Sequence, residues 1–282
     1  MKPVSETLDV SRSNVSDRKN RKTSKKGAYR KTDDVDLLPR IRSLVDERPS
    51  YGYRRIHRLL VRSLVREGKA PVNHKRVYRI MRQNNLLLPR HSGTRPPRTH
   101  DGVVRTTRSN QRWCSDAFEI ACPNGEIVRV AFALDCCDRE ILSYVATTGG
   151  VSGGLIRDLM VQALENRFGR SESLPHPIEW LSDNGSCYTA KETREFAQIV
   201  GLVVCTTPVK SPESNGMAEA FVKTFKRDYV QCSDLPDANA LFRELPKWFE
   251  DYNENHPHKG LKMLSPREFR RTYPGDSPCP VS

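Results

Sequence analysis

Three acidic residues lie in sequence settings that suit a divalent cation: Asp116 in Trp-Cys-Ser-Asp, Asp183 in Leu-Ser-Asp-Asn-Gly-Ser, and Glu219 in Ser-Asn-Gly-Met-Ala-Glu. Thirty-five residues separate Asp183 from Glu219. Carboxylates brought together from separate elements can hold two hard cations such as Mg²⁺, and two such ions can drive phosphoryl transfer on DNA. The chain has 34 acidic residues, so the local settings carry this prediction and the spacing alone does not.

Asp116 is predicted in a strand, on the same face as Cys114 and Phe118, because side chains alternate along a strand. An unpaired carboxylate on an apolar face costs several kcal/mol or titrates neutral, and a bound cation removes that cost. Asp183 follows a predicted strand at 178–182, and ligands collect at the carboxyl ends of such strands. The structural alternatives are an arginine salt bridge for Asp116 and a turn-capping role for Asp183.

Glu219 is predicted on a helix, on a different face from the apolar stripe. Glu219, Lys223 and Lys226 fall at i, i+4 and i+7, so one groove would be lined by a metal-binding carboxylate and two lysines. The lysines are then placed to bind DNA phosphates. The alternative is an ordinary Glu–Lys surface pair, worth only ~0.3–0.5 kcal/mol. The predicted buried stripe consists of Ala218, Phe221, Val222, Phe225 and Tyr229.

Strands and helices alternate over residues 113–206 and would position the acids. Asn124-Gly125 predicts a tight turn between the first two strands. Three antiparallel strands followed by α/β crossings are typical of an α/β ribonuclease-H-like fold with a mixed sheet. Strands are predicted at 113–121, 126–135, 140–147, 178–182 and 202–205, and helices at 152–168 and 191–200.

Residues 35–88 read as a compact helical unit with a basic last helix. Asn73 is predicted to cap that helix, with the apolar residues Val77, Ile80 and Met81 facing inward. Its basic residues predict a helix-turn-helix unit that enters the major groove of DNA. A solvated basic face is the alternative. The candidate DNA-binding residues on this helix are Lys75, Arg76, Arg79 and Arg82.

The net charge of +13 is unevenly distributed. Residues 1–112 hold 29 Lys and Arg against 10 Asp and Glu, and the remainder holds 18 against 24. A basic half joined to a mildly acidic half indicates a DNA-binding arm on a carboxylate-bearing body. No apolar run approaches the ~20 residues of a membrane span, and there is no Cys-x-x-Cys zinc pattern. These features predict a cytoplasmic protein without a membrane partner.

Six sequence blocks, taken in order, resemble the OrfB-type transposases of bacterial insertion sequences, which carry a retroviral-integrase-like (DDE) catalytic core. The resemblance covers about residues 36–272. It implies a ribonuclease-H-like core behind a helical DNA-binding domain, with Asp116, Asp183 and Glu219 as catalytic metal ligands for Mg²⁺ and Mn²⁺ able to substitute. The blocks are Pro49–Arg55, Asn73–Met81, Trp113–Asp116, Ser182–Ser186, Pro212–Lys226, and Tyr252–His258 with Ser265–Phe269.

The resemblance also implies partners and further contacts. It predicts binding of the element's terminal inverted repeats and of target DNA, assembly into at least a dimer, and association with the bacterial nucleoid. An upstream-frame helix-turn-helix protein is a further candidate partner. Asn215 would contact DNA, whereas Asp135 corresponds to a non-catalytic acid. Phe118 replaces a Thr that is frequent in similar enzymes, which adds apolar surface behind Asp116.

We predict five parts for the chain, and transposition as its function. Two alternatives remain open: a non-catalytic DNA-binding regulator, and a ribonuclease-H-type nuclease without joining activity. His256 and His258 are predicted to fold back onto the core or touch DNA rather than bind a metal. The parts are a basic disordered tail (1–34), a helical DNA-binding domain (35–88), a linker (89–112), the integrase catalytic core (113–232) and a C-terminal helical extension (233–282).

Overall fold

The computed structural model of the chain describes residues 34–89, 106–170, 174–206 and 215–273. The predicted basic tail and most of the predicted linker therefore lie outside the described residues. The chain divides into two compact units, Met1–Pro39 and Arg40–Ser282. Of the first unit only the start of one helix is described, so the fold below is that of the second.

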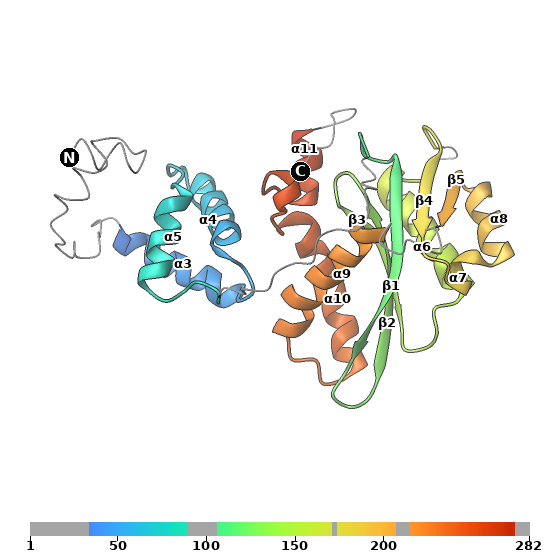
Figure 1. Ribbon diagram of the computed structural model, residues 1–282, viewed down its shortest axis with the longest axis horizontal. Helices are drawn as coiled ribbons and strands as arrows, with labels where there is room; N and C mark the ends of the chain where they lie inside the picture. Colours follow the sequence, from blue (N-terminus) through green and yellow to red (C-terminus); the bar gives the residue numbers. More distant parts are fainter. Residues whose placement is uncertain (1–33, 90–105, 171–173, 207–214, 274–282) are drawn as a thin grey trace, which may run out of the picture. The chain divides into compact units, whose positions relative to one another are not determined.

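Three helices precede the sheet: α3 (Asp34–Glu47), α4 (Tyr53–Arg66) and α5 (His74–Gln83) (Figure 1). The predicted cap of α5 is confirmed, because the side chain of Asn73 accepts a hydrogen bond of 2.8 Å from the backbone N–H of Lys75. Such a cap satisfies a backbone donor that has no partner inside the helix. The apolar residues of α4 and α5 recur at helical spacing and are buried: Ile56, Leu60, Leu64, Val77, Ile80 and Met81.

Five strands form one mixed sheet in the order β3-β2-β1-β4-β5. β1 pairs antiparallel with β2, β2 pairs antiparallel with β3, and β1 and β5 each pair parallel with β4. Each predicted strand begins and ends within one residue of the observed strand. The strands are β1 (Arg112–Ala121), β2 (Ile127–Asp135), β3 (Ile141–Thr147), β4 (Ile178–Ser182) and β5 (Leu202–Thr206).

The β1–β2 turn lies where Asn124-Gly125 predicts it. Gly125 has a φ of +91°, a conformation that a residue with a Cβ rarely adopts, and its N–H donates to the carbonyl of Cys122 at 3.0 Å. The turn thus fixes the register of the two long strands.

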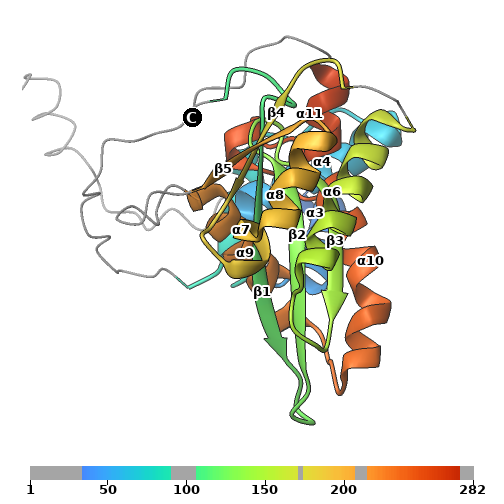
Figure 2. The same ribbon diagram turned by 90° about the vertical axis from the view of Figure 1, so that its right-hand side faces the viewer.

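Helices cover both faces of the sheet, and each face has its own apolar cluster (Figure 1). On one face α9 (Gly216–Asp228) and α10 (Ala238–Glu254) pack against β1 and β3. The other face, toward the viewer in Figure 2, is covered by three helices: α6 (Gly153–Phe168), α7 (Ser186–Thr189) and α8 (Lys191–Ile199). The described part is therefore an α/β ribonuclease-H-like core with an N-terminal helical unit, as predicted.

After α9 the described chain consists of short and long helices joined by loops. It contains the short helices η2 (Val230–Cys232) and η3 (Lys259–Leu261) besides α10, and it ends in α11 (Pro266–Thr272). Ser265 and Glu268 form a reciprocal capping box that starts α11. None of the described helices is long and apolar enough to cross a membrane.

Candidate active site

Asp116 lies in β1 on the face that packs against α9. Its face neighbours Cys114 and Phe118 belong to the apolar cluster, so the strand alternation predicted for this segment is confirmed. The side chain is half-buried, and no salt bridge to it is present in the part of the chain that the structure describes. The arginine partner considered as an alternative is therefore not found among these residues.

The pKa of the Asp116 carboxyl is raised, first because burial disfavours its charged form. A hydrogen bond of 2.8 Å from the backbone N–H of Ala117 to Oδ1 acts in the opposite direction. The charges of Asp183 and Glu219 raise the pKa further. The three predicted acids therefore share one electrostatic environment.

The parallel pairing of β1 with β4 brings Asp183 to the same end of the ladder as Asp116. The parallel ladder ends at the pair Cys114–Leu181, and Asp116 and Asp183 each lie two residues beyond it. Asp183 is exposed, and its Oδ1 accepts a bond of 3.0 Å from the N–H of Gly185. This turn-capping bond occupies one oxygen, and a carboxylate retains further acceptor sites for a cation.

Glu219 is positioned by α9, whose apolar stripe packs against the sheet. Ala218, Phe221 and Phe225 are buried as predicted, whereas the Glu219 side chain is exposed. Lys223 Nζ lies 3.3 Å from Glu219 Oε2, so the surface pair considered as an alternative does form. Exposed pairs of this kind contribute only about 0.3–0.5 kcal/mol. A cation could displace the lysine at little cost.

Among the described residues no three acidic, histidine or cysteine side chains are already gathered at metal-ligand distances. Three carboxylates without a cation repel one another, and this repulsion contributes to the raised pKa of Asp116. The donor set suits a hard divalent ion because all three groups offer carboxylate oxygens. The residues present therefore fit such an ion, and binding requires the acids to draw closer together.

Replacing Asp116 with Asn is expected to stabilise the metal-free protein at neutral pH by roughly 0.5–2 kcal/mol, the usual size of a single stabilising substitution. A carboxyl whose pKa is raised in the folded protein lowers the free energy of unfolding at pH values above its ordinary pKa of about 4, where the unfolded chain is ionised. Below that pH the carboxyl is protonated in both states and the destabilisation disappears. Thermal unfolding in chelator at pH 7.5 and near pH 4 would measure both effects. An Asp116→Asn protein less stable than wild type at pH 7.5 would contradict the expectation.

Phe118 contacts α9 directly behind Asp116. Its ring centroid lies 5.7 Å from that of Phe225 and 6.5 Å from that of Phe221, and Lys226 Nζ lies 5.7 Å from the Phe118 ring centroid. The predicted extra apolar packing at this position is thus confirmed. Lys226 is half-buried over the ring, which holds its ammonium group near β1.

The basic residues predicted on α5 differ in exposure. Lys75 and Arg82 are exposed, whereas Arg76 and Arg79 are half-buried. Three arginines that precede α5 instead pair with acids of α10, α9 and α11: they are Arg48, Arg55 and Arg62. The partners are Asp251, Asp228 and Glu268, respectively.

Asn215, for which the sequence predicts a DNA contact, is only 6% exposed in the structure. Its Nδ2 donates to the carbonyl of Ser115 at 3.2 Å, so it joins the start of α9 to β1, and the DNA contact stays a prediction. No local pattern signals the bond to β1, because the acceptor is a backbone group 100 residues away.

Asp135 and the two histidines are buried in the core. Asp135 is fully buried and its Oδ2 accepts from Arg167 and from the indole N–H of Trp113. His256 and His258 are buried against Tyr252, with His256 Nδ1 2.7 Å from the hydroxyl of Tyr51. The segment that carries the two histidines therefore folds back onto the core.

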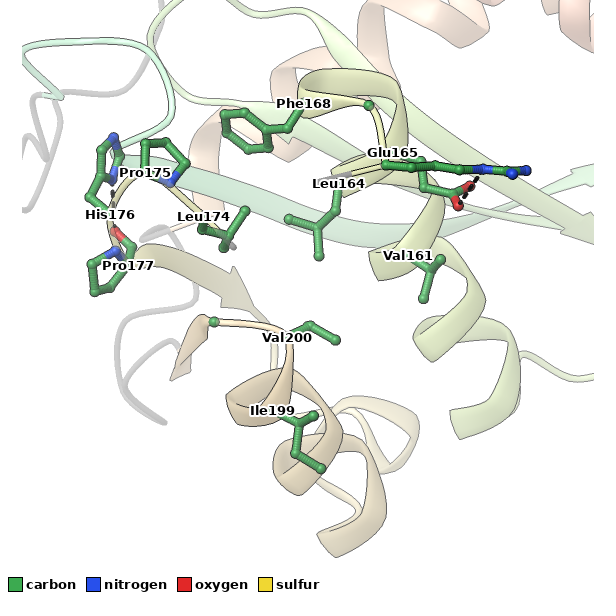
Figure 3. A pocket seen from close by; sticks show the side chains of 13 residues that line it. Val161, Leu164, Glu165, Phe168, Leu174, Pro175, His176, Pro177, Ile199 and Val200 are labelled. Atoms are coloured by element: carbon green, nitrogen blue, oxygen red, sulfur yellow. Dashed lines mark hydrogen bonds and ion pairs between the residues drawn. The ribbon is translucent and has the colours of Figure 1, made fainter. Parts of the chain in front are cut away.

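An apolar pocket of about 830 Å³ lies away from the acids (Figure 3). Its walls come from the end of α6, from Leu174–Pro177 before β4, and from Ile199–Gly201 before β5. These are the amino ends of the two strands, whereas Asp183 follows the carboxyl end of β4. None of the predicted site residues lines this pocket, so the candidate active site is the open surface around the acids.

Comparison with known proteins agrees with this geometry. Two models described as integrase core domain match residues 106–212 and 203–266, and a model described as HTH-like domain matches residues 32–92. The transposase InsD for insertion element IS2A/D/F/H/I/K of Escherichia coli is 54% identical over 244 residues, which are 86% of this chain and 80% of the relative. The InsD transposase for insertion element IS2-9 of Escherichia coli strain K12 is also 54% identical, over 86% of this chain and 79% of its own.

A solved structure shows the same fold at lower identity. The chain aligns with the simian T-cell lymphotropic virus intasome, solved in complex with the PP2A regulatory subunit B56 gamma, at a TM-score of 0.51 and 18% identity. The alignment covers 79% of this chain and 74% of that one. This alignment shows the fold alone, whereas the relatives and the matched domains establish the resemblance seen in the sequence blocks. The chain belongs to the family of DNA transposases of bacterial insertion elements that carry an integrase core domain.

Proposed function

We propose that Asp116, Asp183 and Glu219 bind two divalent cations, Mg²⁺ by preference and Mn²⁺ as a substitute, and that the chain thereby cuts and joins DNA at the ends of its own insertion element. The carrying observation is the placement of the acids: Asp116 and Asp183 each lie two residues beyond the last β1–β4 pair, and the charges of Asp183 and of Glu219 on α9 both act on Asp116. When bound, such ions activate a water or a DNA 3′-hydroxyl and stabilise the leaving oxygen.

The chain's own residues hold the reacting DNA in this proposal. Asp116 and Asp183 each follow the end of the β1–β4 ladder by two residues, and Glu219 is supplied by α9. Lys223 is 77% exposed and exchanges its weak bond to Glu219 for a DNA phosphate. Lys226, held over Phe118, lies on the same helix and contacts the DNA backbone nearby.

The domain division and the partners belong to the same proposal. The helical domain (35–88) and the basic tail (1–34) bind the terminal inverted repeats, the linker (89–112) joins them to the catalytic core (113–232), and the extension (233–282) supports that core. Two element ends are processed together, which requires at least a dimer. An upstream-frame protein and the nucleoid are further partners.

Within the helical domain, Lys75→Ala and Arg82→Ala are each expected to weaken end-DNA binding with little dependence on sequence. Each exposed cation that neutralises a phosphate contributes about one unit to the salt dependence of binding. Binding of end DNA is measured over a series of salt concentrations, and the slope should decrease by about 1 for each variant. Lys191→Ala on α8, exposed and basic, is the control. Equal slopes in all variants would contradict the contact.

The function as a whole is tested with DNA that carries the ends of the insertion element in which the chain is encoded. The purified protein is incubated with this DNA in Mg²⁺, Mn²⁺ or chelator, and cleaved and joined products are separated. Metal-dependent joined products support the proposal. Cleavage without new joints indicates a nuclease, and shifted but uncut DNA in every condition indicates a binding regulator; either result overturns it.

A further inference from the structure

A chain of two buried hydrogen bonds connects β1, the start of α9 and α7, the short helix that follows Asp183. It runs from Asn215, which precedes α9, to Ser115 in β1, and from Ser115 to Tyr188 in α7. Each of these residues lies close in sequence to one acid: Asn215 four residues before Glu219, Ser115 directly before Asp116, and Tyr188 five residues after Asp183. None of them was singled out by the sequence as a member of such a chain.

The first bond compensates for the end of a strand ladder. β4 pairs with β1 only as far as Cys114–Leu181, so Ser115 has no partner residue on β4. A buried carbonyl without a donor is unfavourable, and the Nδ2 of Asn215 supplies that donor at 3.2 Å. The Oδ1 of Asn215 is buried without a hydrogen-bond partner among the described residues. Among the described residues, the Asn215 side chain therefore bonds only to β1, and α9 begins at the next residue.

The second bond joins the side chain of Ser115 to that of Tyr188. Ser115 is fully buried, Tyr188 is 4% exposed, and their hydroxyl oxygens are 2.9 Å apart. Because side chains alternate along β1, the Ser115 hydroxyl points to the opposite face of the sheet from Asp116. Ser115 is thus joined to α9 through its backbone and to α7 through its side chain.

Tyr188 lies against the turn that holds Asp183. The N–H of Gly185 donates to Asp183 Oδ1 at 3.0 Å, and α7 begins at the next residue. A Cβ added at Gly185 would lie 3.0 Å from Asp183 Oδ1 and 3.6 Å from Tyr188 Cδ2, so the turn and the tyrosine ring are closely packed. Fixing the tyrosine hydroxyl therefore fixes the turn relative to β1.

We propose that Ser115, Tyr188 and Asn215 are positioning residues that hold the three acids in register for cation binding. This inference rests on the proposed metal site. The acids are not yet gathered at ligand distances among the described residues, so the cation must draw them together. Elements already tied to one strand lose less freedom in that step, and preorganisation of this kind strengthens binding. Losing a supporting partner of a metal ligand typically weakens metal affinity 10–100-fold.

The test is direct titration of the full-length, metal-free protein with Mn²⁺, with free Mn²⁺ followed by electron paramagnetic resonance. Tyr188→Phe removes one hydroxyl and is expected to raise the half-saturating Mn²⁺ concentration about 10-fold. Asn215→Ala is expected to act in the same direction. Wild-type Mn²⁺ affinity in both variants would overturn the proposal.

Two further variants separate positioning from stability. Tyr51→Phe removes an equally buried hydroxyl bond, to His256 at 2.7 Å, outside the chain of bonds, and should lower the Tm without changing Mn²⁺ affinity. Tyr188→Phe alone leaves the buried Ser115 hydroxyl without its partner, whereas the double variant Ser115→Ala/Tyr188→Phe removes both hydroxyls. The Tm of the double variant should therefore lie closer to wild type than that of Tyr188→Phe, while its Mn²⁺ binding stays weak. Mn²⁺ affinity that simply follows Tm across these proteins would overturn a positioning role.

The variant Asp183→Asn distinguishes a failure of the proposed metal site from a failure of the positioning role. Saturable Mn²⁺ binding in wild type that Asp183→Asn abolishes supports the metal site, whatever Tyr188→Phe does. If wild type binds no Mn²⁺, or if Asp183→Asn leaves binding unchanged, the metal site itself is wrong and the positioning role falls with it.

Discussion

Replacing Glu219 with Gln is expected to reduce DNA cleavage and joining by about 1,000-fold or more, while end-DNA binding stays within about twofold of wild type. A carboxylate ligand contributes several kcal/mol of transition-state charge stabilisation through its metal, and about 4 kcal/mol corresponds to 1,000-fold in rate. Gln keeps the shape of the side chain and its place on the exposed face of α9. Product formation is measured with pre-assembled protein–DNA complexes in Mg²⁺.

Glu244→Gln is the matched control for this experiment. Glu244 also lies on a helix and pairs with a lysine one turn away, Lys247, at 2.7 Å. Loss of that pair removes a comparable surface interaction without a proposed metal ligand. Joining at near wild-type rates by Glu219→Gln would sink the assignment of Glu219, and equal losses in both variants would point to a general effect of removing surface charge.

The largest expected effect on stability comes from Arg167→Ala, which should lower the free energy of unfolding by about 3–5 kcal/mol. The Arg167 side chain is 1% exposed and pairs with Asp135, Asp138 and Glu140. Removing the arginine leaves buried carboxylates without their main counter-charge. The pKa of Asp138 is already raised to about 7, first by burial and then by the charge of Asp135.

Thermal and urea unfolding measure this loss, which corresponds to a decrease in Tm of roughly 6 °C or more for a protein of this size. Arg170→Ala is the control, because that side chain is 94% exposed and lies 3.9 Å from Glu165. Its effect should stay within about 0.5 kcal/mol. An Arg167→Ala protein as stable as the control would mean that the buried charges reorganise or take up protons without cost.

This cluster also explains why Asp135 is not a second candidate for the metal site. Sequence alone leaves it similar to Asp116, since both are acids on apolar strands. In the structure Asp135 accepts bonds from Arg167 and from the backbone N–H groups of Asn110, Cys137 and Asp138. Its oxygens are engaged in closing the β2–β3 corner, whereas Asp116 has one backbone bond and no salt bridge among the described residues.

Much of the fold was predictable because its signals are local. The alternation of buried residues in β1, the cap at Asn73 and the turn at Gly125 each depend on residues a few positions apart. Helix and strand bounds follow from such periodicities, and in the core they agree with the structure to within one residue. The candidate acids were likewise visible in their local settings, and their roles as metal ligands stay a prediction.

The sequence by itself determined the family, the order of elements, and which acids are candidates, because motifs and hydrophobic periods are properties of the chain. The tertiary structure decided which polar groups serve as partners. The Ser-Asn-Gly sequence predicts an exposed Asn215, yet the residue is buried. Its side chain bonds to the carbonyl of Ser115, just beyond the last β1–β4 pair. Ser115 and Tyr188 are 73 residues apart and carry no motif of their own. Such pairings depend on where strands stop pairing and helices cross the sheet, which only the folded chain fixes.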